Sequence, residues 1–400
     1  MIIGLIGKAN VGKSTFFNAT TELAVPAANY PFTTIEPNVG VAYARVKCVC
    51  REFGVQDNPV HSMCIDGNRF IPVKLIDVAG LVPGAHAGKG LGNKFLDDAR
   101  QADVLIHVVD ASGSTDSAGK TVPAGTGDPM FDVSFVEEEF DLWMAGITSR
   151  DWSKTAREAE NQGQKLEQML AKRLSGLAMP EHQIFSAVHE SGLASKKPTQ
   201  WTEDDIRHFC KVLRTRAKPF LIAANKADLT SSDPNIEKIK GSGLAVVPCA
   251  SEAEAMLKKA SKKGILHYLP GDDSFEVKPG VALSEPQKKA LDIVKGLIEK
   301  YGSTGVQEAI NIACFKLLHL VAVYPVEDEF KLADKKGNVL PDVRLLPEGS
   351  TAKDLAGTVH ADLAKGFLYA IDARTKQRIG ADYNLKDRDV VKIVSAASRG

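Results

Sequence analysis

The residues from Gly7 to Ser14 have the types and the spacing that bind a phosphate group. The run GKANVGKS fits the pattern G-x-x-x-x-G-K-[ST], with an apolar strand-like segment before it and a helix-like segment after it. Glycines let backbone N–H groups surround phosphate oxygens, while the lysine reaches the β- and γ-phosphates and the serine hydroxyl holds Mg²⁺. A chance glycine turn is the alternative, and the flanking strand and helix argue against it. The residues predicted to contact a nucleotide here are Gly7, Asn10, Val11, Gly12, Lys13, Ser14 and Thr15.

Two further segments have residues that could sense a γ-phosphate. Thr33 and Thr34 lie in a proline-bounded loop, and the strand-like VKLIDVAG ends in Asp77 and Gly80. In such proteins a threonine hydroxyl binds the magnesium ion only while the γ-phosphate is present. The loop that carries the threonine is therefore ordered with GTP and released with GDP. The aspartate is expected to hold Mg²⁺ through a water, and the glycine N–H to meet the γ-phosphate. We therefore predict Ser14, Thr34 and Asp77 as magnesium ligands and Lys13, Thr34 and Gly80 as catalytic groups.

A third segment indicates which base is bound. AKPFLIAANKADL reads as a buried strand that delivers Asn225, Lys226 and Asp228 in the pattern N-K-x-D. The aspartate can accept hydrogen bonds from guanine N1–H and the exocyclic N2 amine, which adenine lacks. The next strand ends in a loop predicted to contact guanine O6 through backbone N–H groups, and this loop comprises Cys249, Ala250 and Ser251. Each motif follows a strand, at the edge where parallel α/β sheets bind ligands. Together with the N-K-x-D motif, this arrangement predicts that the ligand is GTP.

The segments NVGKSTFFNA, ANYPFTTIEPNVG, DVAGLVPGAHAGKGLGNKFLDD and ADVLIHVVDASGSTD resemble the Obg family of GTPases, in particular the YchF type in its archaeal-like form. The matching motifs cover roughly the first 110 residues and resume near position 218. Several YchF relatives have a degraded fourth motif and prefer ATP, whereas this sequence keeps Asn225, Lys226 and Asp228. The resemblance therefore implies a P-loop α/β G domain that uses Mg²⁺ and favours GTP.

Leu81 raises the question of how water is positioned. Ras-like proteins have a glutamine after the DxxG motif that orients the attacking water, and a leucine cannot polarise water. The alternatives are the backbone of the threonine loop, a K⁺ ion held by Asn10, the side chain of His86, or a group from a partner. Asn10 resembles the P-loop asparagine of potassium-activated GTPases, but it could equally stabilise the turn through its own backbone. Each alternative predicts slow intrinsic hydrolysis.

Length and pattern predict five segments. The G domain is expected in two parts, 1–112 and 206–264, interrupted by a helical, coiled-coil-like insert at 113–205. In the insert, leucines and a methionine recur at helical spacing from Leu166 to Leu177, and 16 acidic residues outnumber 9 basic ones. This acidity argues against direct contact with RNA phosphates, and both a partner-binding arm and a solvated face remain open. A helical connector at 265–320 precedes the last segment, and in it SEPQKKALDIVKGLIEKYG is predicted to begin a helix with the cap Ser284 and a proline in the first turn.

Residues 321–400 resemble a TGS domain, the β-grasp module of threonyl-tRNA synthetases and translation-linked GTPases. The segment alternates one helix candidate with the predicted short strands VAVYPV, EFKLAD, DVRLLP, FLYAIDA and VVKIVSA. It holds 13 basic against 12 acidic residues, so RNA binding is implied by the resemblance and not by charge. A basic patch could be assembled from Arg374, Lys376 and Arg378. The whole chain is a candidate ribosome-associated switch with GTP and GDP as ligands; a stand-alone nucleoside triphosphatase with a metabolic or stress-related role is the alternative.

The overall composition sets limits on other functions. Lys+Arg and Asp+Glu both number 50, so no basic excess announces nucleic acid or membrane binding. The early strand leaves no room for a leader, no apolar run approaches membrane-spanning length, and six dispersed cysteines fit reduced thiols, which together predict a cytoplasmic protein.

Two groups of residues could suggest other chemistry. Cys48, Cys50, His61 and Cys64 offer soft ligands, but C-x-C…H-x-x-C is not a standard zinc spacing. We expect Cys48 and Cys50 to be strand residues on one face, with a metal site as the open alternative. His107, in the apolar run VLIHVVDA, is expected to be a core histidine with satisfied hydrogen bonds and not a catalyst.

Overall fold

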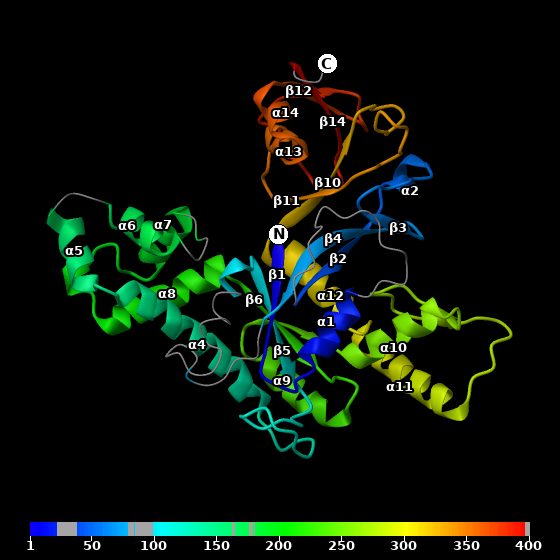
Figure 1. The fold of residues 1–400 in the computed structure, drawn as a ribbon, viewed down its shortest axis with the longest axis horizontal. Helices are drawn as coiled ribbons and strands as arrows, with labels where there is room; N and C mark the ends of the chain where they lie inside the picture. The colour runs from blue at the N-terminus through cyan, green and yellow to red at the C-terminus, as the bar shows by residue number, and fades with distance from the viewer. Residues whose placement is uncertain are drawn as a thin grey trace. The chain divides into compact units, whose positions relative to one another are not determined.

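The computed structural model describes residues 1–21, 38–78, 84, 99–161, 165–175, 179 and 181–396 (Figure 1). Thr33, Thr34, Gly80, Leu81 and His86 lie outside the described residues, so the roles predicted for them stay predictions. The chain forms two compact units. The first comprises Met1–Ala24, Pro37–Gly40 and Lys74–Ala309, and the second comprises Val25–Glu36, Val41–Val73 and Ile310–Gly400.

A seven-stranded sheet has the order β2-β4-β1-β5-β6-β7, with β3 paired to β4. The pairs β1–β4, β1–β5, β5–β6 and β6–β7 are parallel, and β3–β4 is antiparallel. Strands β5 and β6 are buried along their whole length, as expected for central parallel strands covered on both faces. The strands are β1 (Ile2–Ile6), β2 (Val39–Lys47), β3 (Met63–Ile65), β4 (Asn68–Asp77), β5 (Val104–Asp110), β6 (Phe220–Asn225) and β7 (Ala245–Pro248).

The register of the parallel strands brings the predicted motifs to one edge. Leu5 pairs with Asp77, and Asp110 pairs with Asn225, so β1, β4, β5 and β6 end at neighbouring positions. The loop 7–12 leaves this edge and leads into α1 (Lys13–Thr21). This is the P-loop α/β arrangement that the sequence predicts.

The stretch after β5 is helical, as predicted for the insert. Figure 1 shows its helices together with α8, and their apolar side chains share one core with the sheet residues Ile6, Leu105 and Phe220. Leu170 and Leu174 are buried in this core. This segment therefore forms a set of separate helices, whereas the sequence suggested a coiled-coil-like insert. They are α4 (Pro129–Ser149), α5 (Trp152–Asn161), α6 (Leu166–Arg173), α7 (Glu181–Glu190) and α8 (Glu203–Ala217).

The remaining elements of the first unit flank β6 and β7. Helix α11 begins with a capping box between Ser284 and Gln287 and ends at Gly302 in the left-handed conformation, which matches the start predicted from SEPQ. The elements are α9 (Asp233–Lys240), α10 (Ser251–Lys262), β8 (Leu266–His267), β9 (Glu276–Val277), α11 (Glu285–Tyr301) and the first part of α12 (Val306–Asn311).

The second unit contains a five-stranded sheet of order β11-β10-β14-β12-β13. β10 pairs with β14 in parallel, and the other pairs are antiparallel. Helix α13 packs on this sheet through Leu355, over a core that includes Val323 and Val391. The predicted strand EFKLAD is wrong, because those residues form turns and isolated bridges. The elements are β10 (Leu320–Val326), β11 (Arg344–Pro347), α13 (Ala352–Val359), α14 (Ala361–Lys365), β12 (Phe367–Asp372), β13 (Arg378–Ile379) and β14 (Val390–Ser395).

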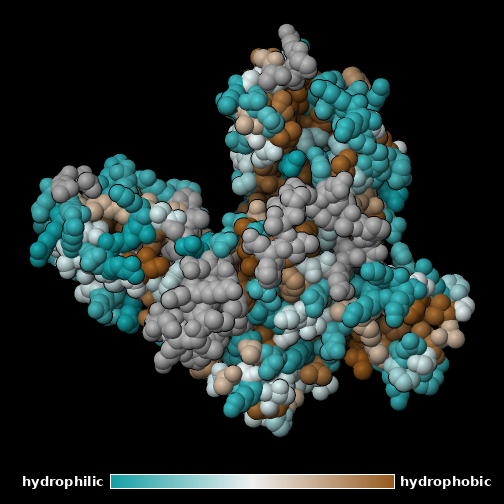
Figure 2. Space-filling model, viewed as in Figure 1, coloured by the Kyte–Doolittle hydropathy of each residue, from teal (hydrophilic) through white to brown (hydrophobic). Residues whose placement is uncertain are grey.

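The described surface is of mixed polarity. Figure 2 shows polar residues over most of one face, with apolar residues in scattered patches. Large exposed apolar side chains belong to separate elements, for example Phe185 on α7 and Ile293 on α11. Among the described residues, no helix combines the length and the apolar character needed to cross a membrane.

Candidate functional site

Close backbone packing explains the glycines of the phosphate loop. A Cβ on Gly7 would lie 2.5 Å from the carbonyl oxygen of Val108, and one on Gly12 would lie 2.2 Å from the side-chain nitrogen of Asn225. Both glycines also have positive φ, at 150° and 93°. Larger residues would push the loop away from the strand ends, so the glycines fix where the first turn of α1 begins.

The predicted phosphate-binding lysine and magnesium aspartate lie in contact. Lys13 Nζ donates to Asp77 Oδ1, and both side chains are largely buried. The Asp77 backbone N–H donates to the carbonyl oxygen of Asn38 at 2.7 Å, which anchors the end of β4. The hydroxyl of Ser14 and the carboxylate of Asp77 are oxygen donors of the kind that Mg²⁺ prefers, so the residues at this edge fit the metal.

Asn225 links the phosphate loop to the loop that opens α10. Its side-chain N–H donates to the carbonyl oxygen of Val11 at 2.9 Å. Its Oδ1 accepts from the backbone N–H of Ser251 at 3.1 Å and from the Ser251 hydroxyl at 2.8 Å. The side chain is buried and satisfied in both directions, so this one amide sets the relative position of the phosphate loop and the predicted base-binding loop.

Lys226 lies along the phosphate loop. Its Nζ donates to Asp110 Oδ2 at 2.9 Å, to the Ser114 hydroxyl at 2.9 Å and to the carbonyl oxygen of Asn10 at 3.2 Å. Burial alone would raise the pKa of Asp110, but hydrogen bonds from Ser112, Lys226 and Ser114 hold it below its usual value. Asp110 therefore stays ionised and positions the lysine. This clamp, in which Asp110 and Ser114 hold Lys226, was not predicted. The run DASGS directly after a buried strand was the available signal.

Asp228, which is predicted to bind guanine, has a carboxylate that is not engaged by the described residues. Its side chain is half-buried and makes no hydrogen bond to another residue in the described part of the chain. The Ala227 backbone N–H donates to the carbonyl oxygen of Cys249 at 2.9 Å, which ties the N-K-x-D loop to the next strand end. A half-buried carboxylate favours a ligand that brings two donors, as guanine does.

The backbone N–H groups predicted to meet guanine O6 are engaged within the chain. Cys249 donates to the carbonyl oxygen of Ala224 at 2.8 Å, Ala250 donates to that of Thr304 at 2.9 Å, and Ser251 donates to Asn225. In this arrangement the loop supports Asn225 and the end of β6. Direct contact of these three residues with the base stays a prediction.

Asn10 contacts a loop that was expected to begin the insert. It has a positive φ of 63°, a conformation that asparagine tolerates, and its Nδ2 donates to the carbonyl oxygen of Gly119 at 2.8 Å. A Cβ on Gly119 would lie 3.0 Å from Ala9, so the loop 113–127 lies against the phosphate loop. The side chain thus braces the turn through a distant loop and not through its own backbone; its role toward K⁺ stays a prediction.

A buried ion pair joins the phosphate loop to α4. Lys8 Nζ lies 2.8 Å from Asp132 Oδ1 and also donates to the carbonyl oxygen of Asp116 at 2.7 Å. Burial raises the pKa of Asp132 to about 6, although Lys8 acts in the opposite direction. A second contact reaches α4 from the segment after the DxxG motif, where the Gly84 backbone N–H donates to Glu139 Oε1 at 2.6 Å.

The structure confirms that His107 is buried in the core, but the expectation that its hydrogen bonds are satisfied is wrong. It is buried on β5, and burial lowers the pKa of its imidazole to about 3, with the charge of Lys8 acting in the same direction. Its Nδ1 has no hydrogen-bond partner among the described residues. A neutral buried imidazole here serves packing.

The three basic residues proposed as a patch are mostly engaged. Arg374 pairs with Glu52 at 2.8 Å and with Asp389 at 3.8 Å, and Arg378 stacks on the ring of Tyr369 at 4.3 Å. Lys376 donates to the carbonyl oxygen of Ala373 at 2.7 Å. The charge of Arg374 is therefore neutralised within the second unit, whereas Arg378 and Lys376 keep their charges in these contacts.

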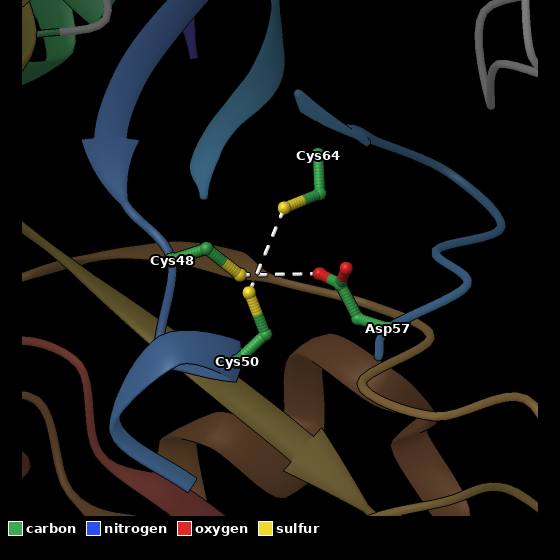
Figure 3. Close-up of side chains that lie close together, drawn as sticks. All are labelled: Cys48, Cys50, Asp57 and Cys64. Atoms are coloured by element: carbon green, nitrogen blue, oxygen red, sulfur yellow. Dashed lines mark hydrogen bonds between the residues drawn. The ribbon is translucent and has the colours of Figure 1, made fainter. Parts of the chain in front are cut away.

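The strand positions predicted for Cys48 and Cys50 are wrong. Cys48 follows the end of β2 and Cys50 is the first residue of α2 (Cys50–Phe53), so they are not neighbours on one strand. The structure gathers both thiols with Cys64 and with Asp57, while His61 is not a member of this group (Figure 3). The chain leaves the strand after Lys47, and this turn lets the thiols converge.

Comparisons with known proteins match the whole chain. The family model of the 50S ribosome-binding GTPase matches residues 2–128, that of the G4 motif-containing domain of YGR210-like Obg-like GTPases matches 223–328, and that of the TGS domain matches 335–395. An uncharacterized GTP-binding protein of Methanocaldococcus jannaschii is 51% identical over 398 residues, covering 99% of each chain. The ribosome-binding ATPase YchF of Bacillus subtilis is 27% identical and covers 92% of this chain and 87% of its own.

A solved structure agrees with these matches. The crystal structure of a GTP-binding protein from Pyrococcus horikoshii OT3 has a TM-score of 0.78 and 43% identity, and the match covers 99% of this chain and 100% of that one. The fold predicted from the sequence is confirmed: a P-loop G domain with helices and a C-terminal TGS domain.

Proposed function

The chain belongs to the YchF and Obg-like family of GTP-binding proteins, and from this premise we propose that it hydrolyses GTP slowly to GDP and phosphate as a cytoplasmic switch on the ribosome or another RNA-containing assembly. The proposal rests first on Asn225, which connects the phosphate loop to the predicted base-binding loop. It rests also on Asp228, whose carboxylate has no hydrogen-bond partner among the described residues.

The proposed hydrolysis depends on electrostatic stabilisation of the transferring phosphoryl group. Bound Mg²⁺ would neutralise charge on the β- and γ-phosphates, held by Ser14, Asp77 and Thr34. Lys13 would exchange its contact with Asp77 for phosphate oxygens. Backbone N–H groups of the phosphate loop, and the one predicted for Gly80 in the DxxG motif, would donate to the same charge. Leu81 offers no polar group to water, so slow intrinsic turnover is expected.

Guanine choice can be tested at Asp228. Replacing its carboxylate with an amide, Asp228→Asn, removes two charge-assisted hydrogen bonds of about 1.5–3 kcal/mol each, which predicts at least about a 100-fold loss of GTP affinity. Binding of xanthosine triphosphate should improve, because its C2 carbonyl accepts from the new amide. Equal binding of ATP and GTP by the unmodified protein contradicts the proposal.

Association with the ribosome is supported by the TGS match and by the name of the Bacillus subtilis relative, a ribosome-binding ATPase. The test is co-sedimentation of the full chain with ribosomal subunits in the presence of a non-hydrolysable GTP analogue or GDP. A switch requires that the two nucleotides give different bound fractions. Equal fractions favour the second candidate, a stand-alone nucleoside triphosphatase with a metabolic or stress-related role.

The K⁺ role of Asn10 has a separate test. Hydrolysis measured in K⁺ and in Na⁺ at equal ionic strength should differ if the amide oxygen holds K⁺ beside the phosphates, and ribosomes can be added to each assay. Equal rates in both salts leave Asn10 with the bracing contact to Gly119.

A further inference from the structure

We propose that Cys48, Cys50, Cys64 and Asp57 form a tetrahedral zinc site that fastens the segment between β2 and β3. Figure 3 shows the three thiols and the carboxylate pointing toward one another. One ligand atom from each of the four residues lies within 4.8 Å of the others. The site lies within the second unit and is independent of the nucleotide function.

Two of the separations between ligand atoms are close to those that a zinc ion would impose. A tetrahedral ion with Zn–S bonds of about 2.3 Å and a Zn–O bond of about 2.0 Å holds its sulfurs about 3.8 Å apart and its sulfur and oxygen about 3.5 Å apart. The sulfurs of Cys50 and Cys64 are 3.8 Å apart, and Cys48 Sγ lies 3.2 Å from Asp57 Oδ2. The donors therefore need little rearrangement to close around one ion.

Residues behind the ligands orient the carboxylate. Arg69 is fully buried and its Nη2 donates to Asp57 Oδ2 at 2.9 Å, while its Nη1 donates to the Ser62 hydroxyl at 2.9 Å. Metal sites commonly orient a ligating carboxylate by such a hydrogen bond. Three thiolates, one carboxylate and Zn²⁺ sum to −2, and the guanidinium cancels half of that charge within the protein.

The chemistry of the group favours zinc over a metal-free thiol cluster, a disulfide or a harder cation. In a metal-free thiol cluster the carboxylate of Asp57 would need only its ion-pair partner Arg69, whereas its Oδ2 also lies 3.2 Å from Cys48 Sγ, among the thiols. A disulfide would join two of the three thiols at about 2.05 Å and leave the third and the carboxylate unused. Three sulfur donors and one oxygen in a tetrahedron suit Zn²⁺, whereas Mg²⁺ and Ca²⁺ take oxygen ligands.

The site would hold together a segment with little regular structure. Between the end of β2 at Lys47 and the start of β3 at Met63, the four-residue α2 is the one helix. The ligands come from the beginning, middle and end of this segment, and Arg69 extends the network by donating to the carbonyl oxygen of Leu340 at 3.0 Å. A metal at this point substitutes for the hydrophobic core that so short a segment cannot form.

The test is metal analysis and cobalt substitution of the full chain. Protein produced with added zinc and purified under reducing conditions should contain one zinc per chain. After removal by a chelator, titration with Co²⁺ should produce thiolate-to-cobalt absorption and tetrahedral ligand-field bands, and the thermal unfolding midpoint should fall without metal and recover with zinc.

Cys64→Ala should abolish the cobalt bands, whereas the matched control Cys314→Ala, which removes a buried thiol elsewhere in the same unit, should keep them. If Cys64→Ala does not fold, the metal content of the unmodified protein still decides the matter. Absence of zinc and of thiolate-to-cobalt absorption in the unmodified protein overturns the proposal. So does a Cys64→Ala variant that binds cobalt like the parent, or a disulfide among these cysteines under reducing conditions.

Discussion

Replacing Asn225 with alanine should weaken the binding of all nucleotides without changing the choice of base. The substitution removes three hydrogen bonds, one to Val11 and two from Ser251. A typical hydrogen bond contributes about 0.5–1.5 kcal/mol, so the three together stabilise the arrangement of these loops by about 2–4 kcal/mol. If a nucleotide must restore that arrangement when it binds, affinity falls roughly 30- to 700-fold, since about 1.4 kcal/mol is a factor of ten.

The assay is titration of the full chain with fluorescent guanine and adenine nucleotides. Because Asp228 is unchanged, the ratio of the two affinities should stay that of the parent. Asn235→Ala is the matched control: Asn235 donates one side-chain hydrogen bond, to the carbonyl oxygen of Ala111 at 2.8 Å. A substitution of that kind changes binding by a factor of about two.

Two results would refute this reasoning. One is an Asn225→Ala protein that binds nucleotide within about threefold of the parent, which places the lost energy well below the range expected for three hydrogen bonds. The other is an equal loss in Asn235→Ala, which would show that the effect is general instability of the strand ends. Circular dichroism of both variants checks that the fold is retained.

Three further predictions concern buried groups. Between pH 7 and pH 5 the parent should lose about 2 kcal/mol of folding stability at His107, because the unfolded imidazole takes up a proton near pH 6.5 and the folded one, with a pKa of about 3, does not. His107→Leu should not show this loss. Urea unfolding at both pH values measures it, and the same pH dependence in variant and parent contradicts the prediction. Lys8→Met should destabilise the protein by about 3–5 kcal/mol at pH 8 and by less at pH 5, where the unpaired Asp132 takes up a proton. An equal loss of stability at both pH values would show that Asp132 is not protonated at pH 5 in the variant. Asp110→Asn should release Lys226 and weaken GTP binding about tenfold, or about 1.4 kcal/mol, in a nucleotide titration; parental affinity would show that the clamp does not matter for binding.

The local patterns in the sequence were sufficient to predict the fold class. Apolar runs before the phosphate loop and before Asn225 became β1 and β6, and the capping signal at Ser284 began α11. Such signals depend on residues a few positions apart, so the sequence exposes them directly. The strand predicted at 329–334 is wrong, because an alternation of apolar and polar residues over so few positions is also compatible with turns.

The parts of the site that were missed depend on contacts between distant residues. Lys226 contacts Asp110, which lies more than a hundred positions away in the sequence, and Asn10 contacts Gly119 in the loop that was expected to begin the insert. Asp57 joins the cysteines only because the chain turns out of β2 and returns through β3. No periodicity or spacing records such convergence, since it follows from how the strands are ordered in the sheet.

Helix α4 can act as a lever. Its first turn is pinned to the phosphate loop by the pair of Asp132 and Lys8, and one further attachment, Glu139 to Gly84, reaches the segment after the DxxG motif. A helix of 21 residues is about 31 Å long, so a tilt of about 4° about its first turn moves the far end by about 2 Å. Helix α4 also shares its core with the helices that follow it, through Phe140 and Met144, so a shift of the phosphate loop on nucleotide binding would be passed to those helices through this packing.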